Sequence, residues 1–259
     1  MKVVILAGGI GSRLAELTRE IPKPMVEIGG YPILWHIMNI YAAQGYKDFI
    51  IALGYKGRII KDFFLDYYAH HADLTINLKD GSINLLSNNG LDWRVTLVDT
   101  GRDTMTGGRI KRLKPHLTDT FMLTYGDGVS NVNIIELLDF HRKHGKMVTM
   151  TTIHPTSKYG KLEIDKDNQV HNFVEKPEFG GDWINGGFMV VEPELLKFID
   201  GDNSVLEREP LEQAATTGNL MAYKHTGFWQ CMDTLRDRND LEYLCQSGNP
   251  PWREIVGVK

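Results

Sequence analysis

The chain has 259 residues, of which 42% are hydrophobic and 24% charged, so it holds enough apolar material to bury a full core as one large domain. Its 33 acidic and 29 basic residues give a formal net charge of −4, and no long basic run occurs that would follow a nucleic-acid backbone. This composition argues against a disordered chain and against nucleic acid as a partner.

The two cysteines, Cys231 and Cys245, are too few for a disulfide framework and lack zinc-binding spacing, which fits a reducing, cytoplasmic location. The apolar start at residues 2–7 runs into Gly8 and Gly9, so it predicts a buried strand rather than a secretory signal. No stretch approaches the roughly 18 apolar residues of a membrane span, and we expect no membrane partner.

Strand and helix patterns alternate through the first 150 residues. The run at residues 2–7 is apolar without alternation, as in a central parallel strand covered on both faces. Further strands are predicted over residues 48–53, 74–78, 83–86, 95–98, 121–125 and 147–153, and helices over residues 32–45, 58–68 and 133–145. The alternation predicts a three-layer α/β/α fold with a mostly parallel central sheet, in which ligands bind at the carboxyl ends of the strands.

The second part of the chain is richer in strands. We expect strands over residues 161–164, 170–175 and 187–191, and helices over residues 194–198, 204–217 and 234–246. Both parts are assigned to a single domain, residues 1–259, with a soft division into a portion 1–150 and a portion 151–259.

A glycine-rich loop follows the first strand and reads Leu6-Ala7-Gly8-Gly9-Ile10-Gly11-Ser12-Arg13-Leu14. Its glycines allow backbone amides to approach a phosphate closely, and Arg13 can bind phosphate oxygens through two N–H groups. Leu14 replaces the third glycine of a dinucleotide fingerprint, and the Gly-Lys-Ser/Thr of a P-loop is missing. The loop is therefore a phosphate-binding hypothesis, with an ordinary strand-to-helix turn as the alternative.

Lys23 lies between two prolines in the segment Ile21-Pro22-Lys23-Pro24-Met25. The prolines restrict the backbone, so the lysine becomes a positioned cation. A lone lysine of this kind is more commonly a solvated surface residue.

Two aspartates are candidate metal ligands. Asp127 follows the strand predicted at 121–125 and has glycines on both sides, which leave room for a bulky ligand at the sheet edge. Mg²⁺ takes one or two carboxylates and completes its shell with phosphate oxygens and water, so a second acid is needed, and Asp233 is the candidate. Taken singly, each aspartate is more simply a turn residue or helix N-cap, especially Asp233 before Thr234.

The second portion holds three short candidate segments. Glu175 and Lys176 follow each other at the end of a predicted strand, so their side chains point to opposite faces and do not pair; a solvated hairpin end fits them equally well. Tyr159-Gly160 and Asn185-Gly186 offer close backbone approach and an amide for hydroxyl groups. By itself Asn185-Gly186 is a hairpin turn signal.

The glycine loop, Arg13 and the Pro-Lys-Pro segment together resemble the signature of the sugar-1-phosphate nucleotidylyltransferases, and the resemblance extends from Met1 to about Trp252. It implies a Rossmann-like nucleotidyltransferase fold, with the nucleotide on portion 1–150 and the sugar phosphate on portion 151–259. It makes Arg13 and Lys23 the catalytic residues and Asp127 and Asp233 the Mg²⁺ ligands. The implied nucleotide contacts are Leu6, Ala7, Gly8, Gly9, Gly11, Ser12, Arg13, Lys23 and Gly126, and the implied sugar-phosphate contacts are Tyr159, Gly160, Glu175, Lys176, Asn185 and Gly186.

Residues 54–57, 98–101, 104–109 and 229–234 resemble the cytidylyltransferase branch of that family. This narrower resemblance adds Thr104 and Arg109 as nucleotide contacts and implies CTP and glucose 1-phosphate as substrates. It further implies a role in CDP-deoxysugar supply for cell-surface polysaccharide such as O-antigen lipopolysaccharide, and a homo-oligomer, with a hexamer as one candidate assembly.

Three alternatives remain open at the level of sequence. A uridylyl- or thymidylyltransferase would share the mechanism, because base selection depends on a few hydrogen bonds that sequence does not display. A non-catalytic sugar-nucleotide-binding protein could share the fold, although Arg13, Lys23, Asp127 and Asp233 argue against it. A metal-dependent glycosyltransferase would favour an acid-x-acid motif over Asp127-Gly128-Val129.

Overall fold

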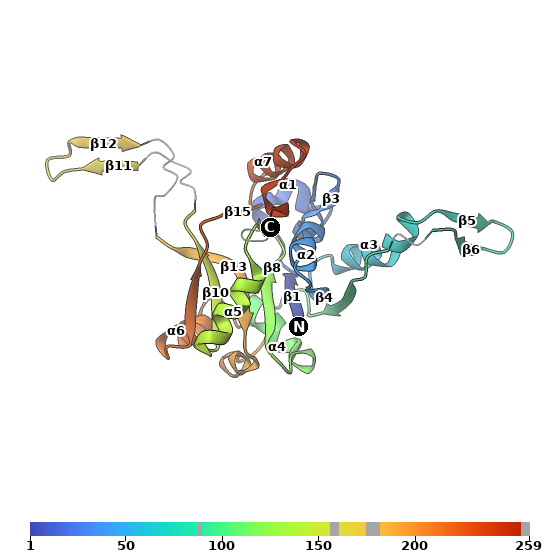
Figure 1. Ribbon diagram of the computed structural model, residues 1–259, viewed down its shortest axis with the longest axis horizontal. Coiled ribbons are helices and arrows are strands. Elements are labelled where there is room, and N and C mark those ends of the chain that lie inside the picture. Colours follow the sequence, from blue (N-terminus) through green and yellow to red (C-terminus); the bar gives the residue numbers. More distant parts are fainter. Residues whose placement is uncertain (88–89, 156–160, 175–181, 255–259) are drawn as a thin grey trace.

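The computed structural model describes residues 1–87, 90–155, 161–174 and 182–254. Its centre is a seven-stranded sheet with the order β14-β10-β13-β8-β1-β4-β7 (Figure 1). The strands are β1 (Lys2–Ala7), β4 (Asp48–Leu53), β7 (Arg94–Asp99), β8 (Phe121–Tyr125), β10 (Val148–Ile153), β13 (Ile184–Val191) and β14 (Leu220–Lys224). Every neighbouring pair is parallel except the two pairs made by β13, so the predicted mostly parallel sheet is confirmed.

Helices cover both faces of this sheet, as the alternation predicts. Val3, Ile5 and Ala7 of β1 belong to one buried cluster, whereas Val4 and Leu6 belong to another on the opposite face. The first cluster is completed by α2 (Ile33–Ala42), α3 (Gly57–His70), α5 (Ile134–His144) and α7 (Leu235–Gln246), and the second by α4 (Thr106–Arg112), η4 (Pro193–Phe198) and α6 (Glu209–Thr216). The three-layer α/β/α fold is thus confirmed.

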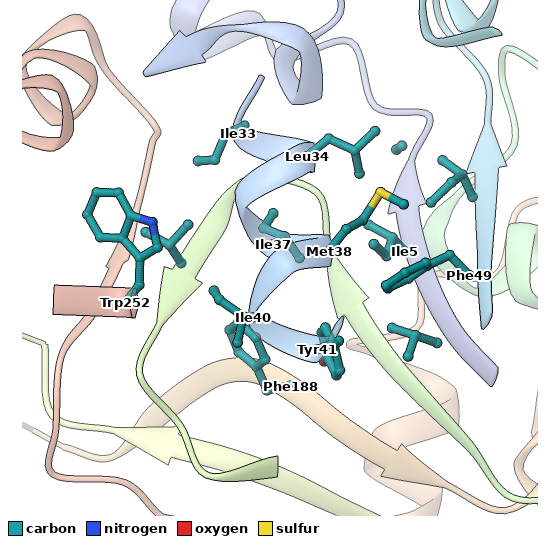
Figure 2. Packing of buried hydrophobic residues seen from close by; sticks show 14 of the residues in the cluster. Ile5, Ile33, Leu34, Ile37, Met38, Ile40, Tyr41, Phe49, Phe188 and Trp252 are labelled. Carbon is teal, nitrogen blue, oxygen red and sulfur yellow. The ribbon is translucent and has the colours of Figure 1, made fainter. Parts of the chain in front are cut away.

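Helix α2 is apolar around most of its circumference because protein surrounds it. Figure 2 shows it between Ile5 of β1 and Phe49 of β4 on one side and Trp252 on the other. The ring of Tyr41 stacks on Phe188 of β13 with ring centroids 5.7 Å apart. Each fully buried side chain of this size contributes roughly 1.5–3 kcal/mol to stability, so this helix anchors the sheet face.

In the second portion two helix predictions need correction. Residues 194–198 lie in the 3-10 helix η4, and the helix predicted at 204–217 begins only at Glu209. The carbonyl groups of Asp202 and Ser204 accept hydrogen bonds from Met105 and Gly108 of the α4 region, so they are not used to start a helix. The edge strand β14 was not predicted from the apolar pattern of the sequence. It pairs in parallel with β10.

Of the strand pairs outside the central sheet, two project from opposite sides of the body (Figure 1). They are β5 (Leu74–Asn77) with β6 (Ser82–Leu85), and β11 (Lys161–Ile164) with β12 (Val170–Val174). The strands were predicted, but their exclusion from the sheet was not. No helix among the described residues is long and apolar enough to cross a lipid bilayer.

Candidate active site

A pocket of about 370 Å³ opens at the carboxyl ends of β1 and β8. The residues predicted for nucleotide and metal, which are scattered along the chain, converge on it from the glycine loop, the Pro-Lys-Pro segment, the start of α4 and the two aspartate segments. It is lined by Leu6, Ala7, Gly8, Gly9, Gly11, Ser12, Arg13, Lys23, Pro24, Thr104, Met105, Thr106, Arg109, Tyr125, Gly126, Asp127 and Asp233. Their contacts with nucleotide and metal remain predictions.

The glycine loop leads from β1 into two short helices, η1 (Ser12–Leu14) and α1 (Ala15–Thr18). Gly11 has a φ of +69°, which a residue with a side chain adopts only with strain, and its carbonyl accepts hydrogen bonds from the amide of Leu14 and the hydroxyl of Thr18, both at 3.0 Å. Gly9 is exposed with open space around its α-carbon. At Gly9 the loop therefore offers its backbone to the pocket with no side chain close by.

Lys23 lies between the two candidate metal ligands. Its ammonium nitrogen is 2.6 Å from Asp127 Oδ2 and 2.6 Å from Asp233 Oδ1, and its side chain is 11% exposed. Arg13 lies at the rim, 77% exposed, with Nη1 2.6 Å from Asp233 Oδ2. The solvated-surface alternative for Lys23 is wrong, because the 3-10 turn η2 (Lys23–Met25) directs the side chain into the pocket.

The contacts within the cluster favour the charged forms of Lys23 and Asp233. Burial by itself would lower the pKa of Lys23, but the charge of Asp127 and the hydrogen bonds to Asp127 and Asp233 outweigh it and raise the pKa above its ordinary value. Burial likewise acts to raise the pKa of Asp233, yet the hydrogen bond from Lys23 and the charges of Lys23 and Arg13 hold it below its ordinary value. An ammonium group therefore sits between two carboxylates.

The two aspartates are brought together by a short antiparallel pair, β9 (Gly128–Ser130) and β15 (Trp229–Cys231). Where this pair ends, the amide of Met232 donates a 2.8 Å hydrogen bond to the carbonyl of Asp127, which places Asp233 beside Asp127. Thr234, not Asp233, caps α7, forming a capping box with Asp237. The N-cap alternative for Asp233 is therefore wrong, and its carboxylate faces the pocket.

The donor set fits a hard divalent cation. Carboxylate oxygens of Asp127 and Asp233 both lie 2.6 Å from one positively charged atom, Lys23 Nζ, so they converge on a point where a cation is stabilised. Among the described residues no group of three or more acidic, histidine or cysteine side chains gathers to hold a metal. Two carboxylates with coordination positions left for phosphate oxygens and water is the arrangement that Mg²⁺ prefers.

Arg109 belongs to the pocket lining but is almost fully buried, with 4% of its surface exposed. Its guanidinium donates to five acceptors: the carbonyls of Gly8, Leu53, Gly101 and Arg102 and the hydroxyl of Thr100, at 2.6–3.1 Å. The family resemblance implies a nucleotide contact at Arg109, which stays a prediction, but this internal role was not predicted. The signal was present in Gly8 and Gly54, whose α-carbons leave the space that the guanidinium fills.

Four pocket residues were not predicted as ligands: Pro24, Met105, Thr106 and Tyr125. Tyr125 ends β8, two residues before Asp127, and Thr106 begins α4. The sequence feature that could have identified Tyr125 is its position at the end of a predicted strand. For Thr106 it is the position at the start of a glycine-containing helix.

On the acceptor side, Asn185 and Gly186 belong to strand β13, so the hairpin-turn alternative is wrong. They lie where the register between β10 and β13 shifts, and Gly187 there has a φ of +73°. Asn185 Nδ2 donates to the Tyr125 hydroxyl at 3.1 Å, which connects this segment to the pocket. Tyr159, Gly160, Glu175 and Lys176 lie outside the described residues.

Together, a mostly parallel sheet, a glycine loop, a positioned lysine and two carboxylates at the carboxyl edge define an α/β enzyme that handles phosphorylated nucleotides. The profile of the nucleotidyl transferase family matches residues 2–231. The chain belongs to this family.

Relatives align with nearly the full chain. This chain is 49% identical over 255 residues to the glucose-1-phosphate cytidylyltransferase of Salmonella typhimurium, and the alignment covers 98% of this chain and 99% of that protein. It is 42% identical to the probable glucose-1-phosphate cytidylyltransferase of Bacillus subtilis, with the same coverage. The crystal structure of HddC from Yersinia pseudotuberculosis superposes with a TM-score of 0.69 at 25% identity, covering 96% of this chain and 99% of that one.

Proposed function

We propose that this protein transfers CMP from CTP to α-D-glucose 1-phosphate, giving CDP-glucose and pyrophosphate. The observation that carries the proposal is the Lys23–Asp127–Asp233 cluster beside an open glycine loop, a site built for polyphosphate and a cation. The base and the sugar follow from the names of the relatives at 49% and 42% identity.

The reaction requires no protein nucleophile. A phosphate oxygen of glucose 1-phosphate attacks the α-phosphorus of CTP in line and forms a new P–O bond, while the bond from that phosphorus to the bridging oxygen breaks and pyrophosphate leaves. The nearby thiol of Cys231 is unsuited to covalent catalysis, because burial, with the charges of Asp233 and Asp127, raises its pKa to about 12.

The residues of the chain position the groups and neutralise charge. We assign Lys23 to the α-phosphate, Arg13 to the outer phosphates, and the amides of Gly8, Gly9 and Gly11 to the triphosphate. Asp127 and Asp233 would hold Mg²⁺, which supplies Lewis-acid charge neutralisation at the phosphates. Since Lys23 contacts both carboxylates here, it must exchange them for phosphate oxygens when the nucleotide binds.

Portion 1–150 carries the nucleotide in this proposal, and portion 151–259 carries the sugar phosphate through Asn185 and Gly186 and through Tyr159, Gly160, Glu175 and Lys176. A cytoplasmic role in CDP-sugar supply for cell-surface polysaccharide is part of the same proposal.

We also propose that the protein is a homo-oligomer. The β5–β6 hairpin projects from the body, and a two-stranded hairpin alone is marginally stable in water. Its large apolar side chains are exposed: Ile76 by 50%, Leu78 by 92%, Ile83 by 60% and Leu85 by 40%. A second copy of the chain packed on this hairpin would bury them.

Pyrophosphate release tests the function. The purified protein is incubated with glucose 1-phosphate and each of CTP, UTP, dTTP and GTP, with and without Mg²⁺. Release that needs CTP, glucose 1-phosphate and Mg²⁺ together is expected. Preference for another triphosphate would retain the mechanism and replace the base, whereas no release with any pair would reject this function. Asp127→Asn serves as an inactive control.

A further inference from the structure

Four polar side chains form a hydrogen-bonded row that crosses from the nucleotide wall to the acceptor side. Thr106 Oγ1 donates to Glu207 Oε2 at 2.7 Å, Tyr125 Oη donates to Glu207 Oε1 at 2.7 Å, and Asn185 Nδ2 donates to Tyr125 Oη at 3.1 Å. Glu207 lies in the turn before α6, in the segment whose carbonyls bond the start of α4. The row thus joins α4, β8 and β13 through one carboxylate.

Fixed backbone donors determine the direction of each bond. The amide of Gly187 donates to Asn185 Oδ1 at 2.8 Å, so Nδ2 must face Tyr125, whose oxygen can only accept from it. At the other end, the amide of Leu206 donates to Thr106 Oγ1 at 2.9 Å, so the Thr106 proton also points away, to Glu207. Both hydroxyl protons therefore require an acceptor, and a carboxylate at position 207 accepts from both.

This arrangement leaves Asn185 with a defined chemical character. One hydrogen of Nδ2 is used by Tyr125, and the second is not used by any bond of the row. Asn185 consequently has an N–H left to donate to a ligand, while its Oδ1 is turned to the amide of Gly187.

We infer that Glu207 is a positioning residue for the glucose 1-phosphate side of the reaction. The amide of Gly187 orients Asn185, and Glu207, by accepting the Tyr125 proton, keeps the Tyr125 oxygen as the acceptor that holds Nδ2 in place, so that the second N–H of Asn185 can reach an oxygen of the sugar phosphate. This rests on the proposed function, which assigns Asn185 to the acceptor. The carboxylate itself need not touch the substrate. No local sequence motif marks it, because Glu207 meets Tyr125 only through the tertiary fold.

Glu207→Gln tests this inference, since the amide keeps the shape of the carboxylate but can accept from only one of the two hydroxyls. One donor in the row must then reverse or lose its acceptor. We expect the KM for glucose 1-phosphate to rise about tenfold, while the KM for CTP changes by less than about threefold. Tyr125→Phe removes the same link, so the double variant should be no worse than either single variant.

Glu209→Gln, an exposed acid two residues along, is the matched control and should leave both KM values unchanged. Thermal unfolding of all variants shows whether they fold alike. If the wild type is active and Glu207→Gln raises both KM values equally, or raises neither, the positioning role is overturned. Additive effects of Glu207→Gln and Tyr125→Phe would overturn it as well. If the wild type releases no pyrophosphate from CTP and glucose 1-phosphate, the proposed function fails, and this inference with it.

Discussion

The guanidinium of Arg109 lies against the α-carbon of Gly8 so closely that a Cβ on the glycine would stand 2.3 Å from Cζ. The close approach of Arg109 therefore requires a glycine at this position, whether or not the loop binds a phosphate. Because Arg109 also bonds the carbonyl of Gly8, it connects α4 to the loop at the pocket.

Arg109→Ala should destabilise the protein strongly. It removes a buried side chain together with its hydrogen bonds to the carbonyls of Gly8, Leu53, Gly101 and Arg102 and to the hydroxyl of Thr100. We therefore expect the free energy of unfolding to fall by about 3 kcal/mol in urea denaturation. Arg112→Ala on the same helix is the control, because that side chain is exposed and pairs with Asp202 at the surface; its effect should be much smaller. Equal losses in the two variants would contradict the buried role of Arg109.

Lys23→Ala should lower turnover by about 10²–10³-fold at saturating CTP and glucose 1-phosphate, because it removes the buried cation that would meet the reacting phosphate. Initial rates of pyrophosphate release measure this. Lys47→Ala is the control, since Lys47 pairs with Asp92 at the surface away from the pocket. Unchanged turnover in Lys23→Ala would remove Lys23 from catalysis.

Asp233 and Thr234 are neighbours with separable roles. Asp233→Asn should abolish most Mg²⁺-dependent activity with little change in stability, because Thr234 and Asp237 cap α7 without it. Thr234→Ala should cost about 1 kcal/mol of stability through the lost cap while most activity remains. Activity and thermal unfolding of both variants decide this, and a stability loss confined to Asp233→Asn would show that the assignment is reversed.

Acid should destabilise the protein in part through His36. Burial, aided by the charge of Arg253, lowers the pKa of His36 below 6.5 despite its hydrogen bond to the carbonyl of Ile28. The unfolded chain then binds more protons than the folded one below about pH 6.5, so this stability is present above that pH and lost as the pH falls.

His36→Gln keeps an N–H that can reach Ile28 but does not titrate. The fall in Tm between about pH 7.5 and about pH 5.5 should therefore be smaller in the variant than in the wild type. An equal fall in both proteins would assign the acid sensitivity to other groups.

Ile83→Asp should reduce the assembly. The side chain is 60% exposed on the projecting hairpin, where a charge would be buried against a second copy. Light scattering should then give a mass closer to the 29.4 kDa of one chain than the wild type does. Lys79→Asp, at the turn of the same hairpin, changes charge without removing an apolar contact and should leave the mass unchanged. A wild-type protein of 29.4 kDa would reject the oligomer.

Features governed by local rules could be derived from the sequence by itself. The apolar runs identified the central strands, and the glycines after β1 and around Asp127 marked the carboxyl edge where the pocket lies, because strand period and glycine geometry depend on neighbouring residues. The pairing of Asp127 with Asp233 could be inferred only through resemblance to a family.

Tertiary structure decided what depends on contacts between distant segments. The β9–β15 pair sets Asp233 beside Asp127, and the fold buries Lys23 between them, which no local pattern shows. Because the carbonyls of Asp202 and Ser204 accept hydrogen bonds from the α4 region, helix α6 begins only at Glu209 and not at residue 204 as predicted. Hydrogen bonds and charges of this kind act across a few ångströms of space, whatever the separation along the chain, so only the folded protein reveals them.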